Sequence, residues 1–216
     1  MNYGSMPVGC VLMASGLSKR FGSNKLLADF NGRPMLCRAF EATDTPLLDA
    51  RIVVTRSPEV EALCRAEGIP VILHALPGRN DTVRLGLEAL LAQCPELAGC
   101  VFLPGDQPLL RRESVEAMVQ CFRQEARTQK ETERAIFRLA YQAKNDPEPT
   151  VGSPVLFGSA YFSALRCLPE GKGGGVLIRK NPEQVHLVSA SRREELMDAD
   201  VPETLELLLR AFPAQP

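Results

Sequence analysis

The sequence predicts an α/β fold: a single-domain, three-layer α/β/α sandwich around a mostly parallel, Rossmann-like sheet. Through the first two thirds of the chain, short apolar runs of strand length alternate with stretches of helical length. Such alternation is typical of parallel strands covered by helices on both faces. The 216 residues contain no internal repeat and no linker long enough to divide them. We therefore expect one domain over residues 1–216.

The expected strands are short and apolar. They lie at residues 8–13, 51–55, 70–73, 100–103, 135–141 and 184–188. The triplet Val155-Leu156-Phe157 is a further short apolar run. Ligands of open α/β sheets gather at the carboxyl ends of the strands. This rule should bring the loops at residues 14–25, 74–80 and 105–108 to one edge of the sheet.

The first helices have recognisable start and stop signals. A helix over residues 34–42 begins with Pro34, which suits a first turn. Ser57 is the expected N-cap of a second helix, and Gly68 is its expected C-cap. A third helix should be capped by Asp81 or Thr82. Its apolar face is formed by Val83, Leu87, Leu90 and Leu91.

The second half of the chain continues with helices separated by polar segments. Helices are expected at residues 112–127, 159–168, 176–179 and 202–212, the last of which closes the chain. Residues 128–134 are expected as a frayed helix end or a surface turn, and residues 145–149 as an exposed loop.

Composition narrows the class of protein. The net charge of −1 argues against a general nucleic-acid or membrane-surface binder, so any anion site must be local. No run of about 18 apolar residues predicts a membrane span, and residues 1–7 lack signal-peptide features. Seven scattered cysteines, an odd number without a Cys-x-x-Cys pair, indicate reduced thiols and a cytoplasmic location.

The loop after the first strand carries the strongest functional signal. A buried strand opens into small residues, including Gly16 and Ser18, and then into the cations Arg20 and Lys25. Exposed backbone N–H groups beside Arg and Lys suit a polyphosphate. The spacing matches neither a Walker loop nor a dinucleotide fingerprint. The alternative is a surface turn whose basic residues are merely solvated.

Asp106 stands at the end of the strand at residues 100–103. Alone, its carboxylate could cap the following helix. Beside a triphosphate site it suits Mg²⁺, which prefers one or two carboxylates with phosphate oxygens. Asp198 and Asp200 precede the closing helix, where acids favour the helix dipole, although Asp200 could be a second metal ligand.

Two further segments have both structural and functional interpretations. Arg79-Asn80-Asp81-Thr82 caps a helix and could also hydrogen-bond a base or ribose. The glycine-rich segment 171–175 could be a lid or acceptor loop, or only a helix-entry turn. His74 and His186 are expected to be structural, and no Ser-His-Asp or Cys-His order supports a hydrolase.

Several blocks resemble the nucleotidyltransferases of the molybdenum cofactor cytidylyltransferase type. Residues 13–27 (MASGLSKRFGSNKLL) match the family's opening signature, and Gly105-Asp106-Gln107-Pro108 matches its Asp-Gln-Pro block. Weaker matches follow in family order. They are residues 32–36 (GRPML), 152–157 (GSPVLF) and 198–203 (DADVPE).

The resemblance implies Mg²⁺-dependent transfer of a nucleotidyl group from an NTP to a phosphorylated acceptor, with release of pyrophosphate. Molybdopterin is the acceptor it implies, and a molybdenum hydroxylase or its maturation factor is the implied protein partner. Guanylyl-transferring relatives usually carry Gly at the position of Ser15, and cytidylyl-transferring ones carry Ala. Because the Ser15 side chain would crowd a purine as Ala does, CTP is favoured over GTP.

These arguments assign residues to four roles. The catalytic residues are Arg20, Lys25 and Asp106, and the metal ligands are Asp106 and Asp200. The nucleotide is assigned to Met13, Ala14, Ser15, Gly16, Ser18, Arg20, Lys25, Asn80, Thr82 and Gly105. The acceptor is assigned to Gln107, Gly152, Ser153, Pro154, Lys172, Gly173 and Gly174. No tightly bound organic cofactor is expected.

The resemblance implies a nucleotide-binding half (about 7–110) and an acceptor-binding half (about 111–200). The acceptor-binding half departs from the family pattern. Ser153 stands where the family has His, and the acidic residue of a Gly-Asp-x-Gly motif near Gly171 is shifted or lost. Alternatives therefore remain open. They are guanylyl transfer to molybdopterin, cytidylyl transfer to a sugar or alditol phosphate, and a non-catalytic carrier or maturation partner of the molybdenum cofactor.

Overall fold

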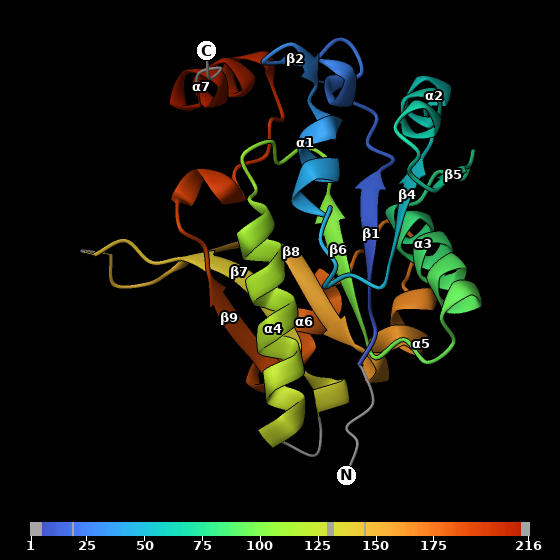
Figure 1. Ribbon diagram of the computed structural model, residues 1–216, viewed down its shortest axis with the longest axis vertical. Helices are drawn as coiled ribbons and strands as arrows, with labels where there is room; N and C mark the ends of the chain where they lie inside the picture. The colour runs from blue at the N-terminus through green and yellow to red at the C-terminus, as the bar shows by residue number, and fades with distance from the viewer. Residues whose placement is uncertain (1–5, 19, 129–131, 145, 213–216) are drawn as a thin grey trace.

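A seven-stranded sheet forms the centre of the computed structural model, with helices on both faces (Figure 1). The structure describes residues 6–18, 20–128, 132–144 and 146–212. The strand order is β5-β4-β1-β6-β8-β7-β9. The strands are β1 (Val8–Ala14), β4 (Ala50–Thr55), β5 (Val71–Leu73), β6 (Gly99–Pro104), β7 (Ile136–Tyr141), β8 (Thr150–Gly158) and β9 (Val185–Ser189).

The sheet is parallel except around one strand. The β1, β4, β5 and β6 pairings are parallel, and β7 pairs with β9 in parallel. β8 lies between β6 and β7 and is antiparallel to both. The prediction of a mostly parallel sheet in a three-layer α/β/α sandwich is confirmed.

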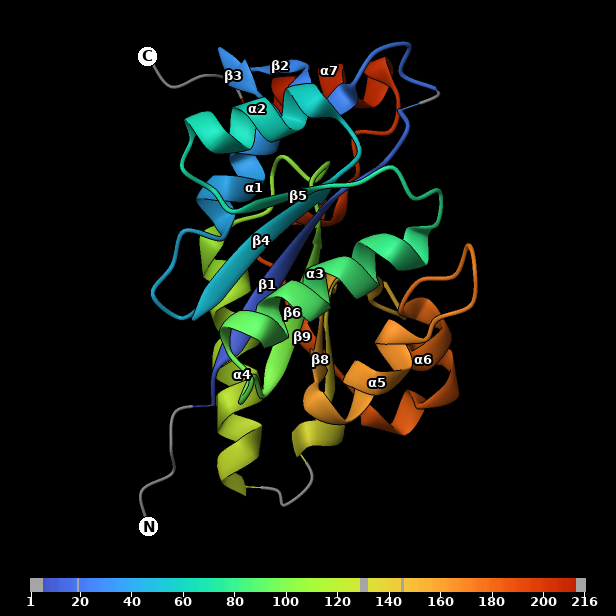
Figure 2. The ribbon, with the colours of Figure 1, turned by 90° about the vertical axis from the view of Figure 1, so that its right-hand side faces the viewer.

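The helices divide between the two faces of the sheet. They are α1 (Leu36–Ala42), α2 (Pro58–Ala66), α3 (Arg79–Gln93), α4 (Arg112–Thr128), α5 (Phe162–Arg166), α6 (Gly175–Lys180) and α7 (Pro202–Ala211). Figure 2 shows α3, α5 and α6 together on one face, with α4 on the other. A two-stranded hairpin, β2 (Asp29–Phe30) and β3 (Arg33–Pro34), lies beside α7 (Figure 1).

The apolar core has two parts, one on each face of the sheet. The face of α1 and α4 buries Leu12, Leu36 and Phe122, while the face of α3 and α5 buries Val11 and Leu87. Gly86 lets α3 lie close to β1, because a Cβ atom there would sit 2.5 Å from Cγ1 of Val11. This close approach fixes the start of α3 near the end of β1.

The structure corrects several expected boundaries. α3 begins at Arg79 with Gly78 as its N-cap, so the predicted cap at Asp81 or Thr82 was wrong. The physical reason is that the Asp81 carboxylate, in the first turn, accepts a hydrogen bond from the Gly78 N–H at 3.0 Å. The apolar triplet 155–157 belongs to the nine-residue strand β8.

Other segments differ in detail. The helix expected at 159–168 consists of a 3₁₀ turn (Ser159–Tyr161) followed by the short α5. In the segment expected as a frayed end or turn, Thr132–Arg134 is a 3₁₀ turn and residues 129–131 lie outside the described residues, as do Lys19 and Asn145. Among the described residues, none of the helices is long and apolar enough to cross a bilayer.

Candidate active site

A cavity of about 780 Å³ opens at the carboxyl ends of β1 and β6, and it gathers most of the sequence-predicted site residues. The predicted residues that line it are Met13, Ser15, Gly16, Ser18, Arg20, Lys25, Thr82, Asp106, Ser153, Gly173, Gly174 and Asp200. Pro77 and Gly78, from the loop before α3, line it too. The expectation that three loops meet at one edge of the sheet is confirmed.

Seven predicted positions do not line this cavity: Ala14, Asn80, Gly105, Gln107, Gly152, Pro154 and Lys172. A Cβ atom on Gly105 would lie 2.8 Å from Leu36 Cδ1, so glycine allows the strand end to pack there. Gln107 is buried, and its Nε2 atom donates a hydrogen bond to the Leu196 carbonyl at 3.5 Å. Lys172 is exposed.

Lys25 joins two carboxylates at one end of the cavity. Lys25 is only 8% exposed. Its Nζ atom donates one hydrogen bond to Asp106 Oδ2 and a second, of 2.7 Å, to Asp200 Oδ1. Burial opposes the ammonium charge, but the bonds to Asp106 and Asp200 outweigh it and raise the pKa of Lys25 above its usual value. Lys25 is therefore a firmly protonated cation between two acids.

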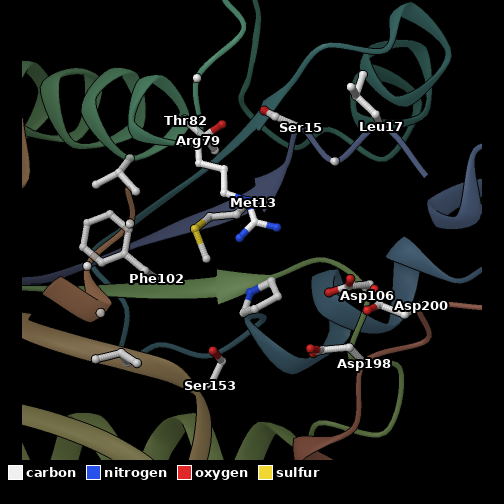
Figure 3. A pocket seen from close by; sticks show the side chains of 18 of the residues that line it. Met13, Ser15, Leu17, Arg79, Thr82, Phe102, Asp106, Ser153, Asp198 and Asp200 are labelled. Carbon is white, nitrogen blue, oxygen red and sulfur yellow. The ribbon is translucent and has the colours of Figure 1, made fainter. Parts of the chain in front are cut away.

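Arg20 and Asp198 complete this charged cluster. Nη2 of Arg20 lies 2.7 Å from Oδ2 of Asp200, so Asp200 contacts two cations. The hydrogen bond from Lys25 is the main reason why the pKa of Asp200 is lowered. Partial burial of the Asp198 carboxyl, followed by the charge of Asp106, raises its pKa to about 6. Figure 3 shows Asp106, Asp198 and Asp200 together on one side of the cavity.

The loop after β1 is held by contacts from β4 and from residues that directly follow β4 and β5. The Ser15 hydroxyl donates to the Val54 carbonyl (3.0 Å) and lies 3.0 Å from His74 Nε2. Arg56 Nε donates to the Ser15 carbonyl at 2.8 Å, and its Nη1 donates to the Pro77 carbonyl at 3.3 Å. Arg56 thus connects the loop after β1 to the loop before α3.

Sequence reasoning missed the far wall of the cavity. Arg138 lines it, and so does an apolar group formed by Phe102, Val155, Phe157, Leu165 and Ile178. Arg56, which lines the cavity beside the loop after β1, was missed as well. No local signal in the sequence pointed to Arg138, because the residues on both faces of β7 are mostly apolar. Ile136 and Ala140, two residues to either side of it, are buried, so Arg138 belongs to the same inward face.

The acidic cluster fits a divalent cation such as Mg²⁺. Asp106 and Asp200 already converge on one positive group, the Lys25 ammonium, and carboxylate oxygens are the ligands that Mg²⁺ takes. Among the described residues, no group of three or more His, Cys, Asp or Glu side chains is arranged to hold a metal alone. Phosphate or water oxygens would have to complete the coordination.

A comparison of the sequence with protein families gives a match to the MobA-like NTP transferase domain over residues 10–186. The chain belongs to this family of NTP transferases. The match spans the loop after β1, Asp106 and the far wall of the cavity, and it stops before Asp198. The prediction of a nucleotidyltransferase is confirmed at the level of the family. The family match does not decide whether the chain is of the molybdenum cofactor type.

Curated relatives and solved structures agree with this family. The 3-deoxy-manno-octulosonate cytidylyltransferase of Polynucleobacter asymbioticus is 34% identical over 105 residues, which are 47% of this chain. That match covers only 41% of the relative. Rv0371c from Mycobacterium tuberculosis H37Rv has the same fold, with a TM-score of 0.75 at 21% identity over 95% of this chain and 99% of its own.

Two further solved structures contain ligands. A CMP:2-keto-3-deoxy-manno-octonic acid synthetase complexed with CTP has a TM-score of 0.70 at 18% identity, covering 95% of this chain and 98% of its own. Rv0371c has also been solved as a complex with manganese. That structure has a TM-score of 0.66 at 18% identity, covering 95% of this chain and 99% of its own. At these identities the likeness shows the fold.

Proposed function

We propose that this chain transfers a cytidylyl group from CTP to a small anionic acceptor and releases pyrophosphate, with Mg²⁺ as its metal. The observation that carries the proposal is the position of Lys25. Its ammonium lies between Asp106 and Asp200, in the same cavity as Ser15, Gly16 and Arg20. A cation-rich loop beside paired carboxylates suits a metal-bound triphosphate.

The choice of CTP rests on the relatives. The curated relatives are cytidylyltransferases, and one structural neighbour contains CTP. On this proposal the base lies against Ser15, Gly16 and the start of α3, where Thr82 lines the cavity. GTP remains the alternative nucleotide, and a direct comparison of the two nucleotides tests the choice.

The residues of the site supply charge and position rather than a nucleophile. An acceptor oxygen attacks the α-phosphorus in line, and the bond from that phosphorus to the bridging oxygen of the leaving pyrophosphate breaks. Arg20 and Lys25 would bind the triphosphate and stabilise the charge that grows on the pyrophosphate. Mg²⁺, held by Asp106 and Asp200, would supply further neutralisation of the phosphate oxygens.

Lys25 would have to change partners during this reaction. Without nucleotide, its ammonium neutralises Asp106 and Asp200. When these carboxylates hold the metal, the ammonium is free to turn toward the phosphates. This exchange keeps the acidic pair compensated in both states, which matters because unpaired, partly buried charges are costly.

The relatives favour a sugar acid, or a sugar or alditol phosphate, as the acceptor. A second candidate is molybdopterin, and a specific observation favours it: Phe102, Val155, Phe157, Leu165 and Ile178 give the cavity an apolar wall that a flat heterocycle could cover. Under this second candidate a molybdenum hydroxylase or its maturation factor would be the protein partner. Ser153, Gly173 and Gly174 line the cavity near this wall and are the predicted acceptor residues present there.

A substrate panel tests the proposal. Purified protein, Mg²⁺ and either CTP or GTP would be incubated with 3-deoxy-manno-octulosonate, 2-C-methylerythritol 4-phosphate or molybdopterin, and pyrophosphate release measured. Release with CTP and one acceptor supports the proposal. Absence of release with every pair contradicts it. Tight molybdopterin binding that Asp106→Ala leaves unchanged, without turnover, would instead favour the carrier.

A further inference from the structure

Arg138 differs from every other half-buried arginine among the described residues because it has no partner. The others each donate to an acceptor. Their partners are Glu41 for Arg38, Phe40 for Arg51, Ser15 for Arg56, Asp81 for Arg84, Ser191 for Arg111 and Asp49 for Arg123. In contrast, the Nε atom of Arg138 is buried and has no hydrogen-bond acceptor.

The surroundings of Arg138 are apolar. It lies in one row of paired residues across the sheet, next to Val155 on β8 and Leu187 on β9. Phe102 on β6 continues the row beyond Val155. These positions share one face of the sheet, and Arg138, Val155 and Phe102 all line the cavity.

The electrostatics agree with this geometry. Burial alone lowers the pKa of Arg138 from its usual value, and no neighbouring carboxylate offsets the effect. A half-buried guanidinium without a counter-charge destabilises the folded protein. Such a cost is typical of groups that a ligand satisfies, since functional sites are often arranged for the ligand rather than for stability.

The nucleotide does not need this cation. The triphosphate already has Arg20 and Lys25, which lie beside Asp106 and Asp200. Arg138 comes from β7, on the other side of β8 from the strands that carry the nucleotide loop. It is therefore a second positive group in the same cavity, set in the acceptor-binding half.

We propose that Arg138 binds an anionic group of the acceptor, a carboxylate or a phosphate, while the acceptor's carbon skeleton lies along Val155 and Phe102. The guanidinium fork matches both anions in a bidentate manner. This assignment rests on the proposed function, because it presumes that the cavity takes a second substrate. On this assignment, Arg138 restricts the acceptor to molecules that carry an anionic group separate from the oxygen that attacks the nucleotide.

Kinetics with three variants test the assignment. Arg138→Met removes the charge and keeps an unbranched side chain that reaches about as far as the Nε atom. Arg138→Lys keeps a charge without the fork, and Arg166→Met changes an exposed arginine of α5 as the control. In the panel above, Arg138→Met should raise the KM for the acceptor at least tenfold and change the KM for CTP less than twofold. Arg138→Lys should lie between, and the control should match the wild type.

A second measurement does not depend on turnover. Without substrates, Arg138→Met should raise Tm by about 2–4 °C, because an unpaired charge is replaced by an apolar side chain. With a non-hydrolysable CTP analogue present, inorganic phosphate or acetate at millimolar concentration should raise Tm of the wild type and of Arg166→Met, but not of Arg138→Met. The anion that raises Tm of the wild type more indicates whether the acceptor carries a phosphate or a carboxylate.

The two proposals fail in different ways. If pyrophosphate is released and Arg138→Met has the wild-type KM for the acceptor, the role of Arg138 is overturned and cytidylyl transfer stands. If no pair of substrates reacts but phosphate or acetate stabilises only the proteins with Arg138, cytidylyl transfer fails and the anion site stands. Equal stabilisation of wild type and Arg138→Met by both anions overturns the anion site.

Discussion

Lys25 and Asp200 lie 175 residues apart in the chain, yet the Nζ atom of the first is 2.7 Å from Oδ1 of the second. Asp106, from the end of β6, contacts the same ammonium. The segment before α7 is fixed at this point by a 2.8 Å hydrogen bond from the Ala199 N–H to the Asp106 carbonyl. Two acids from distant parts of the chain are therefore held around one lysine.

Asp106→Asn should abolish most of the transferase activity. The amide keeps the shape of the side chain but loses the negative charge that would hold Mg²⁺ and balance Lys25. We expect kcat to fall about 100-fold or more, while calorimetry shows acceptor binding within twofold of the wild type. Asp29→Asn, at an exposed position of β2, serves as the control. A kcat for Asp106→Asn close to that of the wild type would contradict the assignment.

Lys25→Met should separate metal binding from catalysis. The ammonium occupies the space between Asp106 and Asp200 and competes with a metal for both carboxylates. Its removal should tighten Mn²⁺ binding in the absence of nucleotide, measured by calorimetry or by the rise of Tm with Mn²⁺. Activity should nevertheless fall, because the triphosphate loses a cation. Weaker Mn²⁺ binding than in the wild type would argue against the exchange of partners.

Arg56→Ala should weaken CTP binding without affecting the acceptor. Arg56 connects the Ser15 carbonyl to the Pro77 carbonyl, so its loss frees two walls of the nucleotide side of the cavity. Hydrogen bonds from charged groups contribute about 1.5–3 kcal/mol, so we expect a rise in the KM for CTP of roughly tenfold or more. Arg65→Ala, whose partner Glu61 is on the same exposed helix surface, is the control. An unchanged KM for CTP would remove Arg56 from this role.

Ser15→Ala should change stability more than nucleotide choice. The sequence suggested that the Ser15 side chain would crowd a purine, but its hydroxyl is bonded to the Val54 carbonyl and faces His74. The loss of this buried bond should cost about 1 kcal/mol of unfolding free energy. The ratio of kcat/KM for CTP over GTP should stay within about twofold of the wild type. A large fall in that ratio would show that the hydroxyl itself selects the base.

His74 should make the protein less stable in mild acid. Burial, followed by the charge of Arg56, lowers the pKa of His74 below its ordinary value of 6.5. The unfolded chain therefore takes up a proton at a higher pH than the folded protein, so the stabilisation is present at neutral pH and is lost as pH falls below about 6.5. Tm measured against pH should fall less steeply for His74→Gln than for the wild type. Parallel curves would contradict this.

The sequence was sufficient to predict that the loop after β1 and Asp106 lie at one edge of the sheet. Lys25 and Asp106 follow two apolar strands, and the rule that ligands lie at the carboxyl ends of parallel strands brings them together. Asp200 could be suggested from sequence but not placed, because its position depends on the path of the segment between β9 and α7. The pairing of Asp200 with Arg20 and Lys25 is a tertiary contact that no local pattern contains.

The far wall of the cavity was not predictable in the same way. Arg138 stands in a strand whose pairing partners cannot be deduced from its own residues, and an arginine in a strand usually faces solvent. Only the register that aligns Arg138 with Val155 places its guanidinium in the cavity. The start of α3 shows the same limit on a smaller scale, since the sequence does not reveal that the Asp81 carboxylate accepts its hydrogen bond from the Gly78 N–H.

The antiparallel strand β8 determines when the site can form during synthesis. β7 is made before β8, but it reaches β6 only through β8, which lies between them. A nascent chain that ends near Tyr141 can already pair β1, β4, β5 and β6, yet its β7 has no neighbour. Arg138 therefore joins the cavity only after residues 150–158 have left the ribosome, and Asp200 follows later still. The growing chain therefore brings the loop after β1 and Asp106 together first, and adds Arg138 and Asp200 last.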